Sequence, residues 1–271
     1  MNANILNYSG YADKLDLETP SWKKVFDYLE AEQDYFLKNT HQFRGKDYKW
    51  PFDALHNWSR VWEYPYVYLQ IPKDGSLKIM DFGSGVTFFP HVITKIGHDV
   101  ACVDIDPVCR RDSLPAGEFY NREKKHSGAI SVPENGKIDG LGEYDLIYSI
   151  SVLEHIRNPE KFIKKFYDAL KPGGRLILTM DIDMRGGQDL TPENFSKIQS
   201  ELKGKFIVEG NIKLTHPSNY LTTANSICPY EKSTFRETKR LIKRLLSNEK
   251  FGPYPMLSSY LSIMALKLRK I

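Results

Sequence analysis

The feature that most constrains the fold of this chain is the alternation of short apolar runs with helical patterns between residues 76 and 184. Four apolar runs have the length and composition of buried strands, at residues 77–82, 99–104, 144–150 and 175–180. A helix between the last two runs is marked by Asn158 as N-cap, Pro159 as first helical residue and Gly173-Gly174 as its end. Strands this apolar that alternate with helices predict a parallel sheet covered on both faces.

The segments outside this region have a different texture. Residues 1–75 are irregular and rich in aromatic residues, and we expect them to form a cap or lid over a core at residues 76–271. The remaining expected elements are helices at residues 87–96, 191–202 and 233–246, and closing strands at residues 206–214 and 257–268. An insertion at about residues 217–256 separates the closing strands, and long connections of this kind often carry a lid or binding loops.

Composition places the chain among globular proteins of a reducing compartment. Of its 271 residues, 41% are hydrophobic and 27% are charged, which excludes fibrous and wholly disordered chains. The formal net charge of +4 is too small to indicate a nucleic acid or an anionic membrane as partner. The three cysteines have no CxxC spacing, and neither a membrane span nor a signal peptide is evident. We therefore expect a cytoplasmic protein with no membrane partner.

The stretch at residues 79–87 carries the chemistry that is easiest to interpret. A strand ends in Asp81, and a Gly-x-Gly sequence made by Gly83 and Gly85 follows before a helix. Such glycines allow a tight turn and let a ligand approach the backbone, close to the free N–H groups at a helix N-terminus. Phe88 stands where the dinucleotide-binding GxGxxG motif has its third glycine, which argues against NAD or FAD.

Three further segments accompany this glycine loop. Asp104 ends the next strand, 21 residues after Gly83, where an acid is placed to accept both hydroxyls of a ribose. The segments YDLIYSISVLEH at residues 144–155 and LKPGGRL at residues 170–176 follow. In this order and spacing, the four segments resemble the class I S-adenosylmethionine-dependent methyltransferase family over about residues 75–184. The resemblance implies a Rossmann-like, doubly wound α/β fold with a seven-stranded, mostly parallel sheet whose last strand is antiparallel.

The resemblance also implies S-adenosyl-L-methionine as cofactor and a set of residues that bind it. Asp81 and the glycine loop would hold the methionine end, and Asp104 the ribose. The full set comprises Asp81, Gly83, Ser84, Gly85 and Thr87 for the methionine end, Asp104, Ile105 and Asp106 for the adenosine, and Ser149 and Ile150 for the methyl group. The acid that the family places after its third strand is not evident in residues 128–136.

The acceptor has to be inferred from other residues at the same edge of the sheet. Methyl transfer is an in-line displacement, and a base is needed only where the acceptor must lose a proton before attack. His155 is our first candidate for that base, since it follows the fourth strand and titrates near neutral pH, although a packing role stays open. Asp181 and His216, after the next two strands, are further candidates, and His91 is interpreted as structural. Asp183 could orient a polar acceptor, and we expect no metal ion.

The aromatic stretch at residues 50–68 has two interpretations. Its rings either form a pocket wall or lid over the acceptor, or fill the core beside the sheet. As a lid, it would offer Arg60 to an anionic acceptor, with Tyr64 and Tyr11 as further lid residues. The basic residues of the helix expected at residues 233–246 form either a solvated face or a contact for RNA.

We therefore predict methyl transfer from S-adenosylmethionine to oxygen or nitrogen of a small metabolite, such as a sugar or a natural-product intermediate. We favour a small-molecule acceptor over nucleic acid or protein, because no known RNA-binding module accompanies the basic helix. Three alternatives stay open: an RNA methyltransferase, a non-catalytic cofactor-binding scaffold, and a nicotinamide-dependent oxidoreductase or epimerase.

Overall fold

The computed structural model describes residues 6–134, 136–138, 140–184, 190–213, 215–228 and 260–271. Most of the insertion expected at residues 217–256, with its helix at residues 233–246, lies outside these residues. Among the described helices, none is long and apolar enough to cross a bilayer. All three cysteines are free thiols, as the absence of a disulfide pattern predicted.

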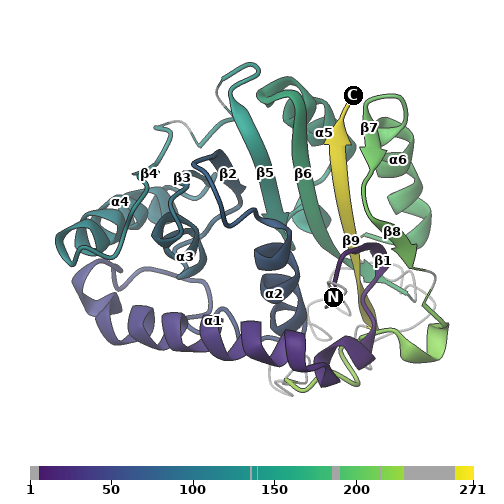
Figure 1. Cartoon of the computed structure of the whole chain (residues 1–271), viewed down its shortest axis with the longest axis horizontal. Helices are drawn as coiled ribbons and strands as arrows, with labels where there is room; N and C mark the ends of the chain where they lie inside the picture. The colour runs from purple at the N-terminus through teal and green to yellow at the C-terminus, as the bar shows by residue number, and fades with distance from the viewer. Residues whose placement is uncertain (1–5, 135, 139, 185–189, 214, 229–259) are drawn as a thin grey trace, which may run out of the picture.

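A mixed sheet runs through the described part of the chain (Figure 1). Its strands are β1 (Tyr8–Tyr11), β2 (Lys78–Phe82), β3 (Asp99–Val103), β4 (Ile130–Ser131), β5 (Tyr144–Ile150), β6 (Leu170–Asp183), β7 (Phe206–Val208), β8 (Asn211–Lys213) and β9 (Leu261–Lys270). The strand order is β4-β3-β2-β5-β6-β9-β1-β8, and β7 also pairs with β9. Strands β2 to β6 pair in parallel and β9 is antiparallel to β6, which confirms the predicted doubly wound sheet and its antiparallel last strand.

The described sheet has nine strands, two more than the seven that the resemblance implied. The single strand expected at residues 206–214 is divided into β7 and β8 around Gly210, whose φ of +77° breaks the extended backbone. The second addition is β1, which comes from the N-terminal region and pairs with both β9 and β8. Part of the expected cap therefore belongs to the sheet itself.

Helices cover both faces of this sheet. They are α1 (Pro20–Asn39), α2 (Arg60–Gln70), α3 (Phe89–Lys95), α4 (Pro107–Arg122), α5 (Glu160–Ala169) and α6 (Pro192–Leu202), with 3-10 turns η1 (Lys14–Glu18), η2 (Thr40–Gln42), η3 (Leu153–His155) and η4 (Pro217–Asn219). The helix expected at residues 191–202 is α6, and Thr191 is its N-cap, its hydroxyl accepting from the backbone N–H of Asn194. The N-cap position of α5 is Pro159 rather than Asn158, so this helix begins one residue later than expected.

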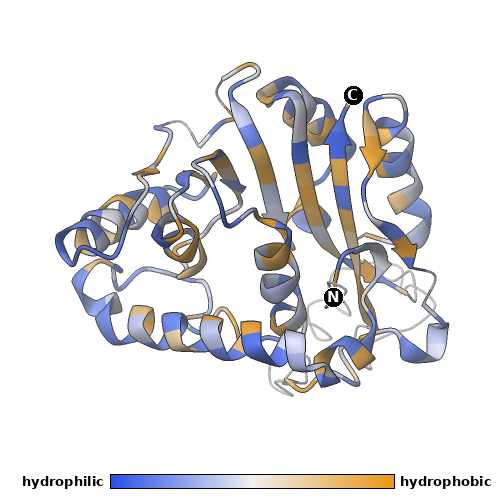
Figure 2. Ribbon diagram, in the orientation of Figure 1, coloured by the Kyte–Doolittle hydropathy of each residue, from blue (hydrophilic) through white to orange (hydrophobic). Residues whose placement is uncertain are grey.

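The core has two parts, one on each face of the sheet. The first joins α1 to α4 to one face, and the second joins α5 and α6 to the other. Consecutive strand residues alternate between them: Ile79 and Met80 of β2 are both fully buried, the former in the first cluster and the latter in the second. Figure 2 shows hydrophobic stretches within β5 and β6, as expected of strands covered on both faces.

Candidate functional site

The loops that carry the predicted site residues gather at one edge of the sheet. Strands β2, β3, β5 and β6 are parallel, so the chain leaves all four at the same edge. Figure 1 shows α1 and α2 near the end of the sheet at which β5 and β6 terminate. In open α/β sheets this carboxyl edge is where ligands bind.

The glycine loop after β2 lies directly against the turn that follows β5. Gly83 and Gly85 have φ values of +78° and +55°, which glycine adopts without strain. A Cβ at Gly83 would lie 2.3 Å from the Cγ2 of Val152, so no larger residue fits without displacing that turn. The Gly83 N–H donates to the carbonyl oxygen of Val103 at 2.7 Å, which ties the loop to the end of β3.

Asp104, after β3, connects the glycine loop to the segment that leads into α4. Its Oδ2 accepts a hydrogen bond from the N–H of Gly85 at 2.9 Å, and its Oδ1 accepts one from the N–H of Asp106 at 2.8 Å. Asp106 in turn caps α4 through the N–H of Val108. Burial raises the pKa of Asp104 above its usual value, and the adjacent Ile105 side chain is 80% exposed. A half-buried carboxylate beside an exposed apolar side chain suits a nucleoside, with the ribose on the acid and the base on Ile105.

Asp81 is the most deeply placed acid of this group. Its side chain is 5% exposed, and burial raises its pKa to about 8, with the nearby charge of Asp104 adding to the effect. An ammonium group bound beside it would favour the ionised carboxylate and lower that pKa. The amino group of a methionine moiety therefore fits the charge of this position.

The segment after α1 holds the glycine loop from the other side. The Arg44 guanidinium donates to the carbonyl oxygen of Val86, and the Val86 N–H donates to the hydroxyl oxygen of Tyr48 at 3.3 Å. Arg44 also lies over the Tyr48 ring, 4.3 Å from its centroid, and over the Phe52 ring at 4.9 Å. No spacing in the sequence singles out Arg44 or Tyr48, and their position against the loop emerges only from the fold.

On the β5 and β6 side, α2 contributes a buried ion pair. Glu63 is fully buried, and its Oε2 lies 2.5 Å from the Nη1 of Arg60. The Ser151 hydroxyl donates to both carboxylate oxygens of Glu63, at 2.8 and 2.9 Å. Ser151 has a φ of +46°, an uncommon conformation for a residue other than glycine. Arg60, predicted to grip an anionic acceptor, thus has an acidic partner from its own helix.

In the 3-10 turn η3, which follows β5, two adjacent titratable residues differ in burial. Glu154 is 6% exposed and its Oε1 accepts from the backbone N–H of Asp181 at 3.2 Å, whereas the predicted base His155 is exposed. Burial, reinforced by the charge of Glu63, raises the pKa of Glu154. Asp181 is half-buried and Asp183 is buried. No pattern in the sequence indicates that the side chain at position 154, rather than that at 155, is buried.

The remaining predicted residues are dispersed. Ser149 donates its hydroxyl proton to the carbonyl oxygen of Phe82, and His216 is exposed at η4. Tyr64 is 5% exposed and packs its ring 4.8 Å from that of Phe89. Other placements are Tyr11 stacked on Tyr220, Ser84 and Ile150 buried, Thr87 half-buried, and His91 buried and hydrogen-bonded to His126 as expected of a structural residue.

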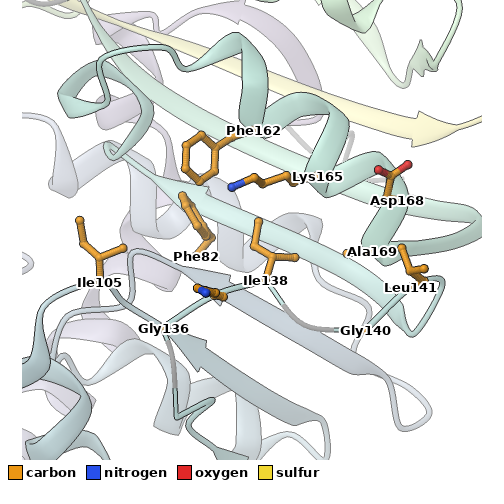
Figure 3. Close-up of a pocket in the computed structure, with 11 residues that line it drawn as sticks. Phe82, Ile105, Gly136, Ile138, Gly140, Leu141, Phe162, Lys165, Asp168 and Ala169 are labelled. Atoms are coloured by element: carbon orange, nitrogen blue, oxygen red, sulfur yellow. The ribbon is translucent and has the colours of Figure 1, made fainter.

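A cavity of about 410 Å³ begins near this edge and extends along the sheet face that α5 covers. Phe82 and Ile105 line it from the ends of β2 and β3, and Phe162 and Lys165 line it from α5 (Figure 3). Figure 3 shows these side chains converging between α5 and the loop that contains Ile138.

Comparison with known proteins yields one family and several distant relatives. Residues 35–203 match a model described as a methyltransferase domain. The chain is 24% identical over 179 residues to a ubiquinone biosynthesis O-methyltransferase of Rattus norvegicus, covering 59% of this chain and 50% of that protein. It is 45% identical over 58 residues to a tRNA U34 carboxymethyltransferase of Campylobacter curvus, covering 21% of this chain and 20% of that protein.

Among solved structures, the chain resembles the [4+2]-cyclase SpnF with a TM-score of 0.51 and 13% identity, covering 89% of this chain and 94% of that one. This likeness concerns the fold alone. The chain spans about half the length of the rat relative, and less than two thirds of a second ubiquinone biosynthesis O-methyltransferase, from Xanthomonas axonopodis pv. citri.

Proposed function

We propose that this chain, which belongs to the class I S-adenosylmethionine-dependent methyltransferase family, transfers a methyl group to oxygen or nitrogen of a small metabolite. The observation that carries the proposal is the pairing of Asp104 with the glycine loop, through the N–H of Gly85 at 2.9 Å. That pairing puts a ribose-binding carboxylate next to backbone that a ligand can approach closely.

Bound S-adenosylmethionine supplies a methyl group already activated on a sulfonium sulfur. The residues of this chain would bind and orient it. Asp81 would receive the amino group of the methionine end, and Asp104 the two ribose hydroxyls. Ile105 and Asp106 would border the adenine, whose base would lie on the exposed Ile105 side chain.

The acceptor would bind where the turn after β5 meets the end of β6. His155, Asp181 and His216 are retained as candidates for proton removal, and Tyr11 and Tyr64 as candidates for the wall of the acceptor site. A sugar or a natural-product intermediate remains our choice of acceptor. The similar SpnF structure is that of a [4+2]-cyclase, so likeness in fold does not by itself determine the reaction.

Calorimetric titration with S-adenosylmethionine and with S-adenosylhomocysteine, using NAD as comparator, tests the cofactor. We expect micromolar binding of the first two and none of NAD. Binding of NAD alone would instead support the oxidoreductase alternative, and binding without methylation of any acceptor would support the scaffold alternative.

One observation favours RNA as a second candidate acceptor. The 58-residue match to a tRNA U34 carboxymethyltransferase is the most identical of the three relatives named above, at 45%. An RNA substrate would bind with an affinity that falls steeply as salt rises, because phosphate contacts release counterions. Titration of tRNA at 50 and 200 mM salt distinguishes this candidate from a small metabolite.

A further inference from the structure

The acids where β5 and β6 end differ in how their charge is compensated. Glu63 is fully satisfied, because Arg60 lies 2.5 Å from one carboxylate oxygen and the Ser151 hydroxyl is shared between both. A buried carboxylate with a cation and two hydrogen bonds is a stable arrangement. Arg60 and Glu63 therefore largely neutralise one another.

Glu154 has no such compensation. Its Oε1 accepts from the Asp181 backbone N–H, but its buried Oε2 has no hydrogen-bond partner among the residues that the structure describes. The nearby cation, Arg60, is already paired with Glu63. A buried carboxylate oxygen without a donor is costly, so a ligand that brings a donor and a positive charge would be favoured there.

We propose that the acceptor of this site reacts through an amine, and that Glu154 binds its ammonium form and accepts its proton. This inference rests on the proposed function and narrows its acceptor from oxygen or nitrogen to nitrogen. An ammonium group provides both the N–H donor that Oε2 lacks and the missing charge. An alcohol provides only the donor, and an anionic acceptor would face two carboxylates.

The proton and the electrons then balance as follows. The ammonium proton passes to Glu154, which leaves a neutral amine with a free lone pair. That lone pair forms the nitrogen–carbon bond to the methyl group while the carbon–sulfur bond breaks, and its electron pair remains on sulfur as a thioether. The methylated amine carries the positive charge, and Glu154 returns its proton to solvent.

The surroundings of Glu154 favour the transfer. Three groups face it: Glu63 and Arg60 from α2, and the Asp181 segment of β6. Burial and the charge of Glu63 raise the pKa of Glu154 toward that of an amine, which makes proton exchange between the two accessible. The neighbouring His155 is exposed and is not needed for this step.

Sinefungin provides a probe that does not require the acceptor to be known. It resembles the methyl donor but carries a primary amine on carbon where the donor carries its methylated sulfur. S-adenosylhomocysteine is neutral at that place, and S-adenosylmethionine is positive without an N–H. Calorimetry should show sinefungin binding about tenfold more tightly than either of the others.

Glu154→Gln should reduce this preference to near unity and leave S-adenosylhomocysteine affinity unchanged. Glu193→Gln, the same change at an exposed position of α6, is the matched control and should have no effect. The melting temperature of Glu154→Gln at pH 7 should be close to that of the wild type, because the raised pKa keeps Glu154 protonated in the free protein and glutamine has the same shape without a charge. Titrations in buffers of different ionisation enthalpy should show proton release on sinefungin binding at pH 7, and Glu154→Gln should abolish it.

Four results would overturn the proposal. The first is equal affinity for sinefungin and S-adenosylhomocysteine, and the second is a preference for sinefungin that survives Glu154→Gln. The third is that S-adenosylmethionine and sinefungin both bind more tightly than S-adenosylhomocysteine by the same factor, which would mean that Glu154 stabilises the sulfonium charge. The fourth is that sinefungin binds only when Mg²⁺ is present and that Glu154→Gln abolishes this dependence on Mg²⁺, which would make Glu154 a metal ligand. If none of the three compounds binds, the proposed function itself fails and this inference fails with it.

Discussion

Asp104 shows how a single side chain joins loop structure to ligand binding. In the proposed cofactor site, replacing it by Ala would remove the acceptor for two ribose hydroxyls, each hydrogen bond to a charged group contributing roughly 1.5–3 kcal/mol. We expect Asp104→Ala to weaken S-adenosylhomocysteine binding by at least about tenfold in calorimetric titration. The same strand offers a matched control in Asp99, at its opposite end, where Asp99→Ala should leave the affinity unchanged. Similar affinities for wild type and Asp104→Ala would remove the ribose assignment.

Asp81 should make the stability of the ligand-free protein depend on pH. Its pKa is about 8 in the folded protein and near 3.8 when exposed, so the folded state keeps a proton that the unfolded state loses. Stability is then full below about pH 4 and declines as the pH rises toward about 8, by an amount on the order of a few kcal/mol. Urea unfolding at pH 6 and pH 8.5 should show a smaller decline for Asp81→Asn than for the wild type. A decline of the same size in both proteins would contradict the assignment.

At this scale, the sequence predicted the residue types better than their directions. Gly83 and Gly85 were identified from a motif whose backbone requirement is local, and both have positive φ. The sequence predicts His155 as the base because imidazole titrates near neutrality, and Glu154 is not among its candidates. Which of two adjacent side chains is buried depends on how η3 packs against β6, and that is not encoded in their spacing.

At the scale of elements, the contact between the glycine loop and the turn after β5 can be tested by a pair of substitutions. Gly83→Ala would place a methyl group 2.3 Å from Val152, in addition to the strain of a positive φ. We expect Gly83→Ala to lower the free energy of unfolding by roughly 1–3 kcal/mol. Val152→Ala in the same chain should recover part of that loss.

Gly142→Ala separates the two contributions to that loss. Gly142 also has a positive φ, but a Cβ there would meet nothing within 4 Å, so this variant reports strain alone. Urea titrations of the single and double variants give the coupling energy. Additive effects of Gly83→Ala and Val152→Ala would mean that the contact does not determine the loop.

The sequence predicted well those elements that have a strong local pattern. The apolar runs are of this kind, and β2, β3, β5 and α6 appear where expected. β6 contains the expected run at residues 175–180 but begins at Leu170, before the two glycines that were expected to end the preceding helix. Where partners decide the structure, prediction was weaker. β1 is a strand because β9 and β8 lie beside it. The expected strand at residues 206–214 is divided at Gly210, whose positive φ the apolar pattern does not reveal.

At the scale of the whole molecule, the proposed cofactor site lies at β3 and β2, and β1 and β8 form the opposite side of the sheet. Gly10→Val tests whether the two are energetically separate, since a Cβ at Gly10 would lie 2.5 Å from the carbonyl oxygen of Lys213. We expect a loss of roughly 1–3 kcal/mol in stability with unchanged S-adenosylhomocysteine affinity. Gly204→Val, with a positive φ but open space, should cost less. A matching loss of affinity in Gly10→Val would show that the halves are coupled.

The position of β9 has a consequence for how the protein is made. β9 pairs with β6 on one side and with β1 on the other, in the register Gly10 to Ala265. Residues 8–11 leave the ribosome long before residues 261–270, so β1 lacks its partner β9 while the strands from β2 to β8 are being synthesised. During that interval the edge of β6 is open to other chains. Nascent chains stalled before residue 261 should therefore need chaperones more than finished ones.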